Sequence, residues 1–385
     1  MIQIPDHEFP QRIASTQEAM ARNELDLLLA FSTESEPAHV RYFSDYWPSF
    51  ETAAVLIPVS GQPTLLIGPE SGTFAASRSK IPDIISLRDF RESSQPNYPG
   101  SKLPEWKDVL TCHHSSRIGI AGWDMFPHSM MENLRQAVGN AEIHSADEVV
   151  RSVTLRKSAS ELNCLREAAR ISELGFQAVL EEIRPGMTEA ELAGIAVAAM
   201  MAHGAEAPGY PVWCCSGPNS RQAISRPTHR RIGTGEIVHF SVGAKVAGYS
   251  ASVGRPVVLG HCPADTRKFL QTGLDAMRMT IDLMRAGTVA GEVARSVHGW
   301  ISEQGFGETI LYGPAHGCGQ MECEFPFVET NSTFTLEKDM AFMVDVFLAD
   351  EKQGFRWEDG IVVRDGAAEE LSGAQRKIQI LEISS

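Results

Sequence analysis

Two carboxylates within apolar stretches are the first residues of this 385-residue chain that suggest chemistry. Asp345 interrupts MAFMVDVFLA, and Glu358 stands in GFRWEDGIVV. Both stretches have the composition of buried strands. Because burying an unpaired carboxylate is costly, we expect both side chains to line a pocket. The neighbouring Arg356 and Asp359 could belong to the same site, or could form no more than a structural ion pair.

A histidine, a cysteine and a glutamate lie in the preceding glycine-rich stretch, YGPAHGCGQMECEFP at 312–326. His316 could belong to the same pocket or could be a core histidine bonded to the backbone. Cys323 stands beside Glu324 and seven residues after His316, which would suit a nucleophilic thiolate, although a free cysteine is more often a small buried apolar residue. An imidazole and carboxylates together suit an amine or amidinium ligand.

The charge balance limits the kind of ligand. The chain has 34 Lys and Arg against 49 Asp and Glu, a formal net charge of −15, and no basic run. Nucleic acid and anionic membranes bind clustered cations, so we expect a small-molecule or peptide substrate, no nucleic acid and no membrane. The seven cysteines have no CxxC spacing, and no apolar stretch of signal-peptide length begins the chain. We therefore expect a reduced, cytoplasmic protein.

The elements that must position these residues fall into two predicted domains. Residues 1–150 alternate short apolar runs with helical patterns, as an α/β domain does. Their predicted strands include LDLLLAF, TAAVLIPV, TLLIG and RIGIAG. A long helical pattern then begins at Ser158, where Glu161 three positions later completes a capping box. We place the domain boundary near 150–157 and the second domain at 151–385.

The second domain contains an internal repeat. Residues 183–206 align with 284–307 at a constant offset of 101 residues, with matching arginine, glycine, glutamate and alanine positions. Each copy reads as a helix, a turn at glycine, a second helix and a strand-rich stretch. Alanine-rich helices can resemble one another by chance, but the matched strand stretches favour a duplicated ααββ unit. Two such units would form one curved sheet with helices outside.

Three strings in this domain, at 237–259, 312–326 and 340–363, resemble the creatinase/prolidase/methionine aminopeptidase superfamily in order, spacing and glycines. The resemblance covers the whole chain, because a creatinase-type N-terminal domain also precedes the duplicated domain. It implies an α+β protein: an N-terminal creatinase-type α/β domain, then a pita-bread domain with a curved antiparallel sheet and helices outside.

The resemblance also implies a metal-ligand set that this sequence keeps only in part. Metal-dependent members of the superfamily hold a dinuclear centre with Asp, Asp, His, Glu and Glu. Here Ser241 and Ser252 take the two aspartate positions, whereas His316, Asp345 and Glu358 take the other three. Two metal ions need anionic oxygen ligands, so the loss predicts no metal and no cofactor. A one-metal site on the remaining triad is the alternative.

Two histidine positions of the superfamily are also changed. The first, which is catalytic in the family, falls on Ile224, and isoleucine cannot move a proton. The second falls on Cys323, which a retained Glu324 follows. His229 or His239 could replace the missing base if either faces the site.

The creatinase branch, which is metal-free, shows the same kind of change at the two aspartates. In creatinase, a Phe and an Arg of the partner subunit reach the substrate from a stretch resembling residues 41–58. Here Trp47 belongs to an aromatic cluster that could form a wall for a cationic ligand, and Glu51 is the charged residue nearest to the arginine position. Creatine itself is not expected, because its carboxylate would lack a guanidinium partner.

We therefore predict a metal-independent, creatinase-like hydrolase of a C–N bond in a small nitrogen-rich metabolite, such as a guanidino, amidine or amide compound. It would be a homodimer in which the N-terminal domain caps the partner's site. His316 would act as an acid or hydrogen-bond donor, Glu358 and Asp345 would hold the cationic part and orient water, and Glu324 would support His316. Eight residues are expected to bind substrate: Cys323, His229, Tyr249, Arg255, Trp47, Glu51, Ser241 and Ser252.

Two other functions remain open. A catalytically inactive pita-bread protein that binds a peptide or partner is favoured by the isoleucine at 224. A metal-dependent Xaa-Pro peptidase would contain stoichiometric metal and would lose its activity with a chelator.

Overall fold

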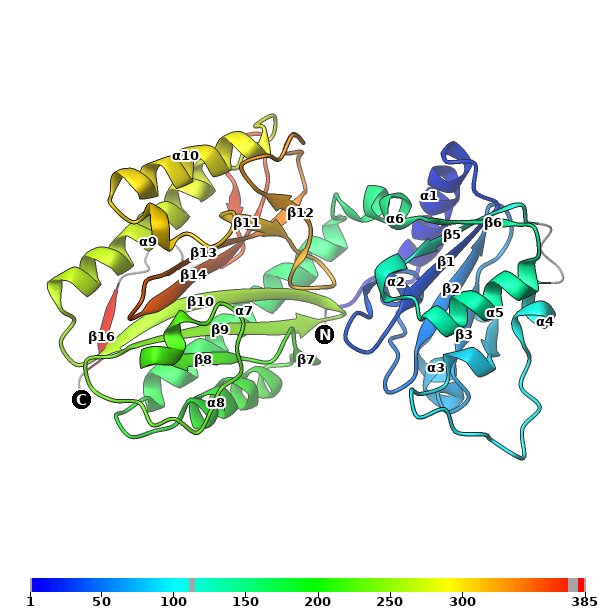
Figure 1. Ribbon diagram of the computed structural model, residues 1–385, viewed down its shortest axis with the longest axis horizontal. Helices are drawn as coiled ribbons and strands as arrows, with labels where there is room; N and C mark the ends of the chain where they lie inside the picture. Colours follow the sequence, from blue (N-terminus) through cyan, green and yellow to red (C-terminus); the bar gives the residue numbers. More distant parts are fainter. Residues whose placement is uncertain (1, 111–114, 373–379, 384–385) are drawn as a thin grey trace. The chain divides into compact units, whose positions relative to one another are not determined.

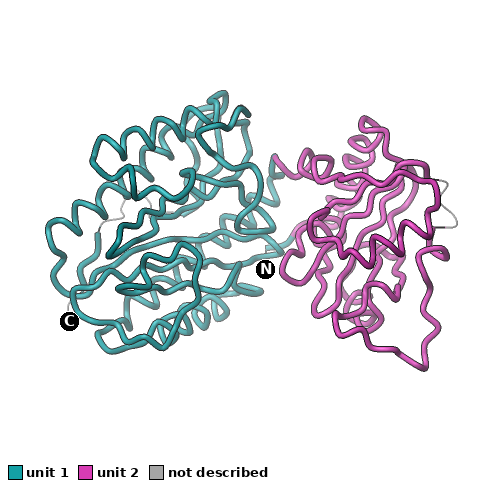
Figure 2. Tube along the Cα trace, viewed as in Figure 1, with its two compact units in different colours: residues 1–3, 156–385 teal, residues 4–155 magenta. Residues whose placement is uncertain are grey.

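The computed structural model describes residues 2–110, 115–372 and 380–383. The chain divides into two compact units, one of residues 4–155 and one of residues 1–3 and 156–385 (Figure 2). Among the described residues, no helix is both long and apolar enough to span a bilayer.

The first unit is built on a six-stranded sheet in the order β4-β3-β2-β1-β5-β6 (Figure 1). Its central strand β1 (Leu27–Ser32) runs parallel to β5 (Arg117–Ala121) and antiparallel to β2 (Ala53–Pro58). All six residues of β1 are buried, as expected for a strand covered on both faces. The remaining strands are β3 (Thr64–Ile67), β4 (Ile84–Ser86) and β6 (Glu142–Ser145).

Helices cover both faces of this sheet. One apolar cluster joins it to α1 (Glu8–Arg22), α2 (Ala38–Ser44), α3 (Gly72–Arg78) and α6 (Asp147–Thr154). A second cluster joins the other face to α4 (Trp106–Leu110) and α5 (His128–Val138). Alternate residues of β1 serve the two clusters, since Leu28 and Ala30 belong to the first and Leu27 and Leu29 to the second.

The second unit is built on a ten-stranded, mostly antiparallel sheet whose main path is β12-β11-β13-β14-β10-β9-β7. Its long central strands are β9 (Ile237–Val246), β10 (Tyr249–Leu259), β13 (Ala341–Ala349) and β14 (Gly354–Val362). Shorter strands complete the sheet: β7 (Ala207–Pro208), β8 (Trp213–Ser216), β11 (Ala315–Gly317), β12 (Glu324–Val328), β15 (Glu369–Glu370) and β16 (Leu381–Ile383).

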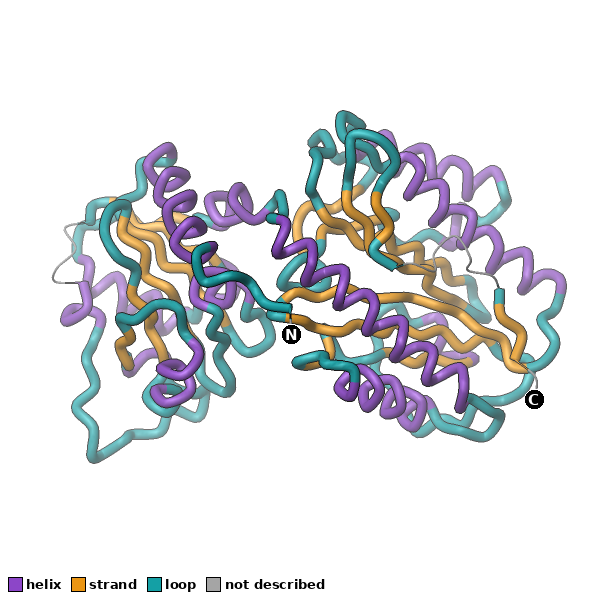
Figure 3. The backbone as a smooth tube through the Cα atoms, turned by 180° about the vertical axis from the view of Figure 1, so that it is seen from behind, coloured by secondary structure: helices purple, strands orange, loops and turns teal. Residues whose placement is uncertain are grey.

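Four long helices accompany this sheet: α7 (Ala159–Glu182), α8 (Glu189–Ala202), α9 (Ala264–Leu283) and α10 (Ala290–Glu303). α7 packs on β9 and β10, and α9 packs on β13 and β14, so both lie across one face of the sheet (Figure 3). The capping box that the sequence predicts at Ser158 and Glu161 is formed, and Thr188 and Glu191 form another at the start of α8. Because α7 and α9 cover one face of the sheet, the opposite face is the one on which a site can lie.

Candidate functional site

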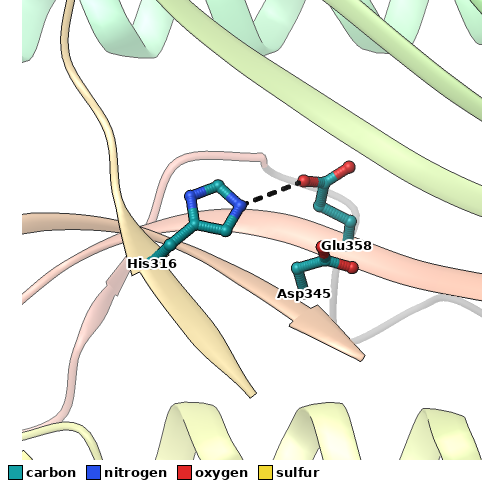
Figure 4. Close-up of side chains that lie close together, drawn as sticks. All are labelled: His316, Asp345 and Glu358. Carbon is teal, nitrogen blue, oxygen red and sulfur yellow. Dashed lines mark ion pairs between the residues drawn. The ribbon is translucent and has the colours of Figure 1, made fainter. Parts of the chain in front are cut away.

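The face of the sheet that α7 and α9 do not cover carries a polar cluster from three strands. Successive side chains of a strand point to opposite faces, so Glu358 of β14 faces away from Trp357, whose indole nitrogen donates to the backbone of α9. Asp345 of β13 lies directly across from Glu358, and His316 of β11 pairs with Met343, one strand further along. Figure 4 shows the three side chains pointing toward one another.

His316, Asp345 and Glu358 are all buried, and each offers a ligand atom within 4.8 Å of the other two. His316 Nε2 lies 3.9 Å from Glu358 Oε1 (Figure 4). Asp345 is fixed on both sides: the Tyr312 hydroxyl donates to Oδ2 at 2.7 Å, and Arg356 Nε lies 3.2 Å from Oδ1. Glu358 is different, because no donor within the described ranges bonds to either of its oxygens.

Arg356 belongs to this face and not to a pair with Asp359. It alternates with Trp357 on β14, donates to Tyr312 Oη at 2.8 Å and to the Ala223 carbonyl at 2.9 Å, and stacks on the Trp213 ring at 4.7 Å. Asp359 points to the opposite face, where it forms a buried ion pair with Arg255. Arg356 is therefore a cation of the site, positioned to hold Asp345 in one orientation.

Electrostatics show that the cluster carries excess negative charge. Burial raises the pKa of Glu358 well above its ordinary value, the charges of Glu322 and Asp345 raise it further, and Arg356 offsets only part of this. Burial alone would lower the pKa of His316, but interaction with the Cys323 side chain and the charge of Glu322 raise it to about 10. Without a bound cation, the cluster therefore favours protons on both Glu358 and His316.

Glu322 is a site residue that the sequence analysis missed. It lies in the loop between β11 and β12, and its Oε1 accepts a hydrogen bond of 2.9 Å from Ser252 Oγ. Its charge also raises the pKa of Glu358. The sequence does contain a signal for this residue. Glu322 is an acid that stands six residues after His316, in the glycine-rich stretch that follows this histidine.

The two serines at the aspartate positions both lie on the site face. Ser252 contacts Glu322, and Ser241 Oγ lies 3.5 Å from Arg356 Nη1. Cys323, at the rim, is exposed and interacts with His316. The structure thus brings Ser241, Ser252 and Cys323 to the cluster, and their contact with substrate stays a prediction.

Other residues expected at the site lie elsewhere. Tyr249 and Arg255 occupy odd positions of β10, which face the helices: Tyr249 donates to Glu161 at the start of α7, and Arg255 pairs with Asp359. Both residues were expected to bind substrate. Strand alternation places them on the opposite face of the sheet from the cluster, so that expectation is wrong for this site. Glu324 does not support His316, because its carboxylate lies 3.3 Å from the buried ammonium of Lys157.

Neither candidate for the missing base takes part in the cluster. His229 is exposed in the loop after β8. The ring of His239 is fully buried against Phe347, with 6.2 Å between ring centroids, and burial together with the charge of Arg356 lowers its pKa to about 3. His239 is therefore neutral near pH 7. Ile224 is 81% exposed.

The two expected binding residues of the first unit are engaged within that unit. The Arg41 guanidinium lies 3.9 Å from the centre of the Trp47 ring. Glu51 is buried and accepts hydrogen bonds from the backbone nitrogens of Glu70 and Ser71, both at 3.1 Å, just before α3 begins. Local packing therefore accounts for both side chains.

The donor set fits one divalent ion and not two. An imidazole nitrogen and carboxylate oxygens are accepted by zinc, iron and manganese, and Glu358 has two buried oxygens without a donor. At the positions of the other two ligands, Ser241 and Ser252 offer neutral hydroxyls that already contact Arg356 and Glu322. Among the described residues, one imidazole and two carboxylates thus have the chemistry that a single divalent ion would need.

Comparison with known proteins agrees with this fold. Residues 163–365 match metallopeptidase family M24, and residues 12–154 match the creatinase/prolidase N-terminal domain. The Xaa-Pro dipeptidase of Pyrococcus furiosus is 23% identical over 369 residues, which cover 96% of this chain and 99% of the relative. The Xaa-Pro dipeptidase of Pyrococcus horikoshii is 25% identical over 322 residues, which cover 83% of this chain and 89% of the relative.

Solved structures show the same architecture. The prolidase of Pyrococcus horikoshii OT3 has a TM-score of 0.81 at 22% identity and covers 94% of this chain and 97% of its own. The Xaa-Pro dipeptidase of Bacillus anthracis has a TM-score of 0.82 at 22% identity, with coverages of 98% and 100%. The predicted α+β fold, a creatinase-type N-terminal domain followed by a pita-bread domain, is confirmed.

These comparisons also correct the functional prediction. The metal-independent, creatinase-like hydrolase of guanidino or amidine compounds is wrong, because the relatives carry the name Xaa-Pro dipeptidase and the matched family is one of metallopeptidases. The chain belongs to metallopeptidase family M24 and carries the creatinase/prolidase N-terminal domain of that family.

Proposed function

We propose that this protein hydrolyses the C–N amide bond of a dipeptide of the Xaa-Pro type, with one divalent metal ion held by His316, Asp345 and Glu358. The observation that carries the proposal is the convergence of these three buried side chains within 4.8 Å, in a chain whose relatives are named Xaa-Pro dipeptidases. A divalent ion bound there would polarise the scissile carbonyl and lower the pKa of a water molecule.

The protein's own residues supply orientation and charge. Tyr312 and Arg356 hold the two oxygens of Asp345 in fixed positions, so little side-chain freedom is lost when a ligand binds. Both oxygens of Glu358 are buried without a donor among the described residues, which suits them to hold a cation, and its raised pKa means that a proton is released when the cation binds. His316 Nε2 faces Glu358 Oε1, so both ligand atoms point toward the same place.

The rim of the site supports a substrate with an apolar ring. Phe327 lies 6.4 Å from His316 between ring centroids and is 45% exposed. Tyr312, beside Asp345, stacks on Phe347 with 6.2 Å between ring centroids. Aromatic surface next to a few fixed polar groups is typical of a small-molecule pocket, and a proline ring would contact it.

A paired substitution tests the proposal. The wild-type protein is assayed with Xaa-Pro and Xaa-Ala dipeptides in the presence of Mn²⁺, Co²⁺ or Zn²⁺. We expect hydrolysis of Xaa-Pro, a loss of about 10²–10⁴-fold in kcat/KM for His316→Ala, and nearly wild-type rates for the exposed control His229→Ala. Absence of hydrolysis by folded, metal-supplied protein, or equal rates for the two variants, would overturn the proposal.

The homodimer remains a prediction that rests on family resemblance. Light scattering coupled to gel filtration tests it, with twice the 42.1 kDa chain mass expected. A monomeric mass would contradict it.

A further inference from the structure

The loop between β11 and β12 directs one of its two neighbouring glutamates into the metal-binding cluster and uses the other as an anchor. Glu324 pairs with the buried Lys157 at 3.3 Å and accepts a hydrogen bond of 2.8 Å from the Met321 nitrogen. Glu322 instead reaches Ser252 Oγ at 2.9 Å and interacts with Glu358.

This loop is tied to the sheet on the near side of Glu322 as well. The Gly319 carbonyl accepts from the Ser250 nitrogen at 2.7 Å, and the Gln320 carbonyl accepts from Lys245 Nζ at 2.8 Å. Anchors on both sides therefore fix the backbone that carries Glu322. Side chains held by such surroundings can bind an ion without a large loss of conformational freedom.

The acids of the cluster outnumber its cations, because Arg356 and His316 face the three carboxylates of Asp345, Glu358 and Glu322. Asp345 faces Arg356 at 3.2 Å, whereas Glu358, only 1% exposed, has no donor among the described residues on either oxygen. A second carboxylate, Glu322, bonds to Ser252, which lies on β10 two positions from Gly254, the residue paired with Glu358. Glu358 has no donor among the described residues, and the donor to Glu322 is the neutral hydroxyl of Ser252. A shared cation would stabilise both carboxylates, because the attraction to a divalent ion replaces their mutual repulsion.

The small residue at 252 makes this arrangement possible. Ser252 Oγ is already within hydrogen-bond distance of the Glu322 carboxylate. A carboxylate at 252 would extend toward the position that Glu322 occupies, so the two positions offer alternative places for one anionic oxygen.

We infer that Glu322 is the fourth side chain of the cation site, so that one imidazole and three carboxylates hold a single divalent ion. The inference rests on the proposed function and goes beyond it, because it names a ligand-bearing residue outside His316, Asp345 and Glu358. It also means that the acid at 322 compensates for the serine at 252.

Calorimetric titration of chelator-treated protein with Mn²⁺ tests the inference independently of activity. We expect Glu322→Gln to raise the Kd for Mn²⁺ by at least about tenfold. The matched control Glu324→Gln should change it by less than about threefold, with thermal unfolding showing that the control is folded. If loss of the Lys157 partner unfolds that control, the exposed Glu329→Gln takes its place.

A rescue variant sharpens the result. Adding Ser252→Asp to Glu322→Gln should restore most of the lost Mn²⁺ affinity, because it returns a carboxylate to the same place. Wild-type affinity in Glu322→Gln, with binding abolished in His316→Ala, would overturn the inference and leave the proposed function standing. Failure of the folded wild-type protein to bind any ion would overturn both.

Discussion

Glu358 should make the metal-free protein less stable than it would be with a neutral side chain. Its carboxylate is buried, has no donor among the described residues, and lies near two other acids. We therefore expect Glu358→Gln, which keeps the size of the side chain and removes the charge, to stabilise chelator-treated protein while abolishing activity. A stabilising substitution at a catalytic position is typical of sites whose charge serves function.

The magnitude follows from the spacing of the acids. At a separation of 4.8 Å, the upper limit between the ligand oxygens of Asp345 and Glu358, two like unit charges repel by about 3.5 kcal/mol at an effective dielectric constant of about 20. Proton uptake limits this loss of stability. A carboxyl that stays protonated in the folded state lowers the free energy of unfolding of the protein by at most about 3.7 kcal/mol between about pH 4.3 and pH 7. Because Arg356 offsets part of the repulsion, we expect a gain of about 1–3 kcal/mol.

The pH dependence has a defined sign. The pKa of Glu358 is raised on folding, so the folded state binds more protons than the unfolded state, and stability falls as pH rises above the ordinary carboxyl pKa. The gain from Glu358→Gln should thus be larger near pH 7 than near pH 4, where it should be nearly absent. It corresponds to a rise in Tm of about 2–8 °C for a domain of this size.

Thermal unfolding in excess chelator, followed by circular dichroism at several pH values, measures the effect. Asp345→Asn is the matched contrast: it removes the partner of Arg356 and should destabilise the protein by about 3–5 kcal/mol. A lower Tm for Glu358→Gln than for wild type near pH 7, or a gain that does not depend on pH, would refute the reasoning.

Three further outcomes follow from the packing around the site. Arg255→Met should lower the unfolding free energy in urea by about 3–5 kcal/mol, because it removes the guanidinium that pairs with the buried Asp359; no change would show that the ion pair is not needed. Gly254→Ala would place a Cβ 2.6 Å from Glu358 Cβ, so it should cost about 1–3 kcal/mol and weaken Mn²⁺ binding in titration. Glu189→Ala removes the acceptor of four hydrogen bonds from Ser216 and Asn219, and should speed protease cleavage in the loop after β8; an unchanged cleavage rate would contradict this.

Local signals explain how much of the fold could be predicted from the sequence. The run LDLLLAF predicts a buried central strand, and β1 is buried throughout. Ser158 followed by Glu161 predicts a helix start, and α7 begins there with both capping hydrogen bonds formed. These features depend on neighbours in the chain, so the sequence displays them directly.

The site is harder because it depends on which face of each strand is covered. Asp345 and Glu358 stand out as acids in apolar strands, and they do converge. Tyr249 and Arg255, however, were expected beside Ser252, although each lies an odd number of positions from it. In a regular strand such residues point to opposite faces, so the alternation alone could have excluded that arrangement.

Glu322 could not be placed from the sequence because a loop carries it. Only the hydrogen bonds of Gly319, Gln320 and Glu324 to other parts of the domain determine that this carboxylate points to Ser252. The prediction of metal independence, which the match to a metallopeptidase family contradicts, weighed only the positions 241 and 252 and did not consider an acid outside the matched positions, such as Glu322.

Metal content and turnover measured on one preparation test the central claim most directly. Chelator-treated protein is titrated with Mn²⁺ while hydrolysis of an Xaa-Pro dipeptide is followed. We predict that one ion binds per chain and that hydrolysis rises in proportion to occupancy. Hydrolysis at an undiminished rate in excess chelator, or folded protein that binds no ion, would contradict the claim.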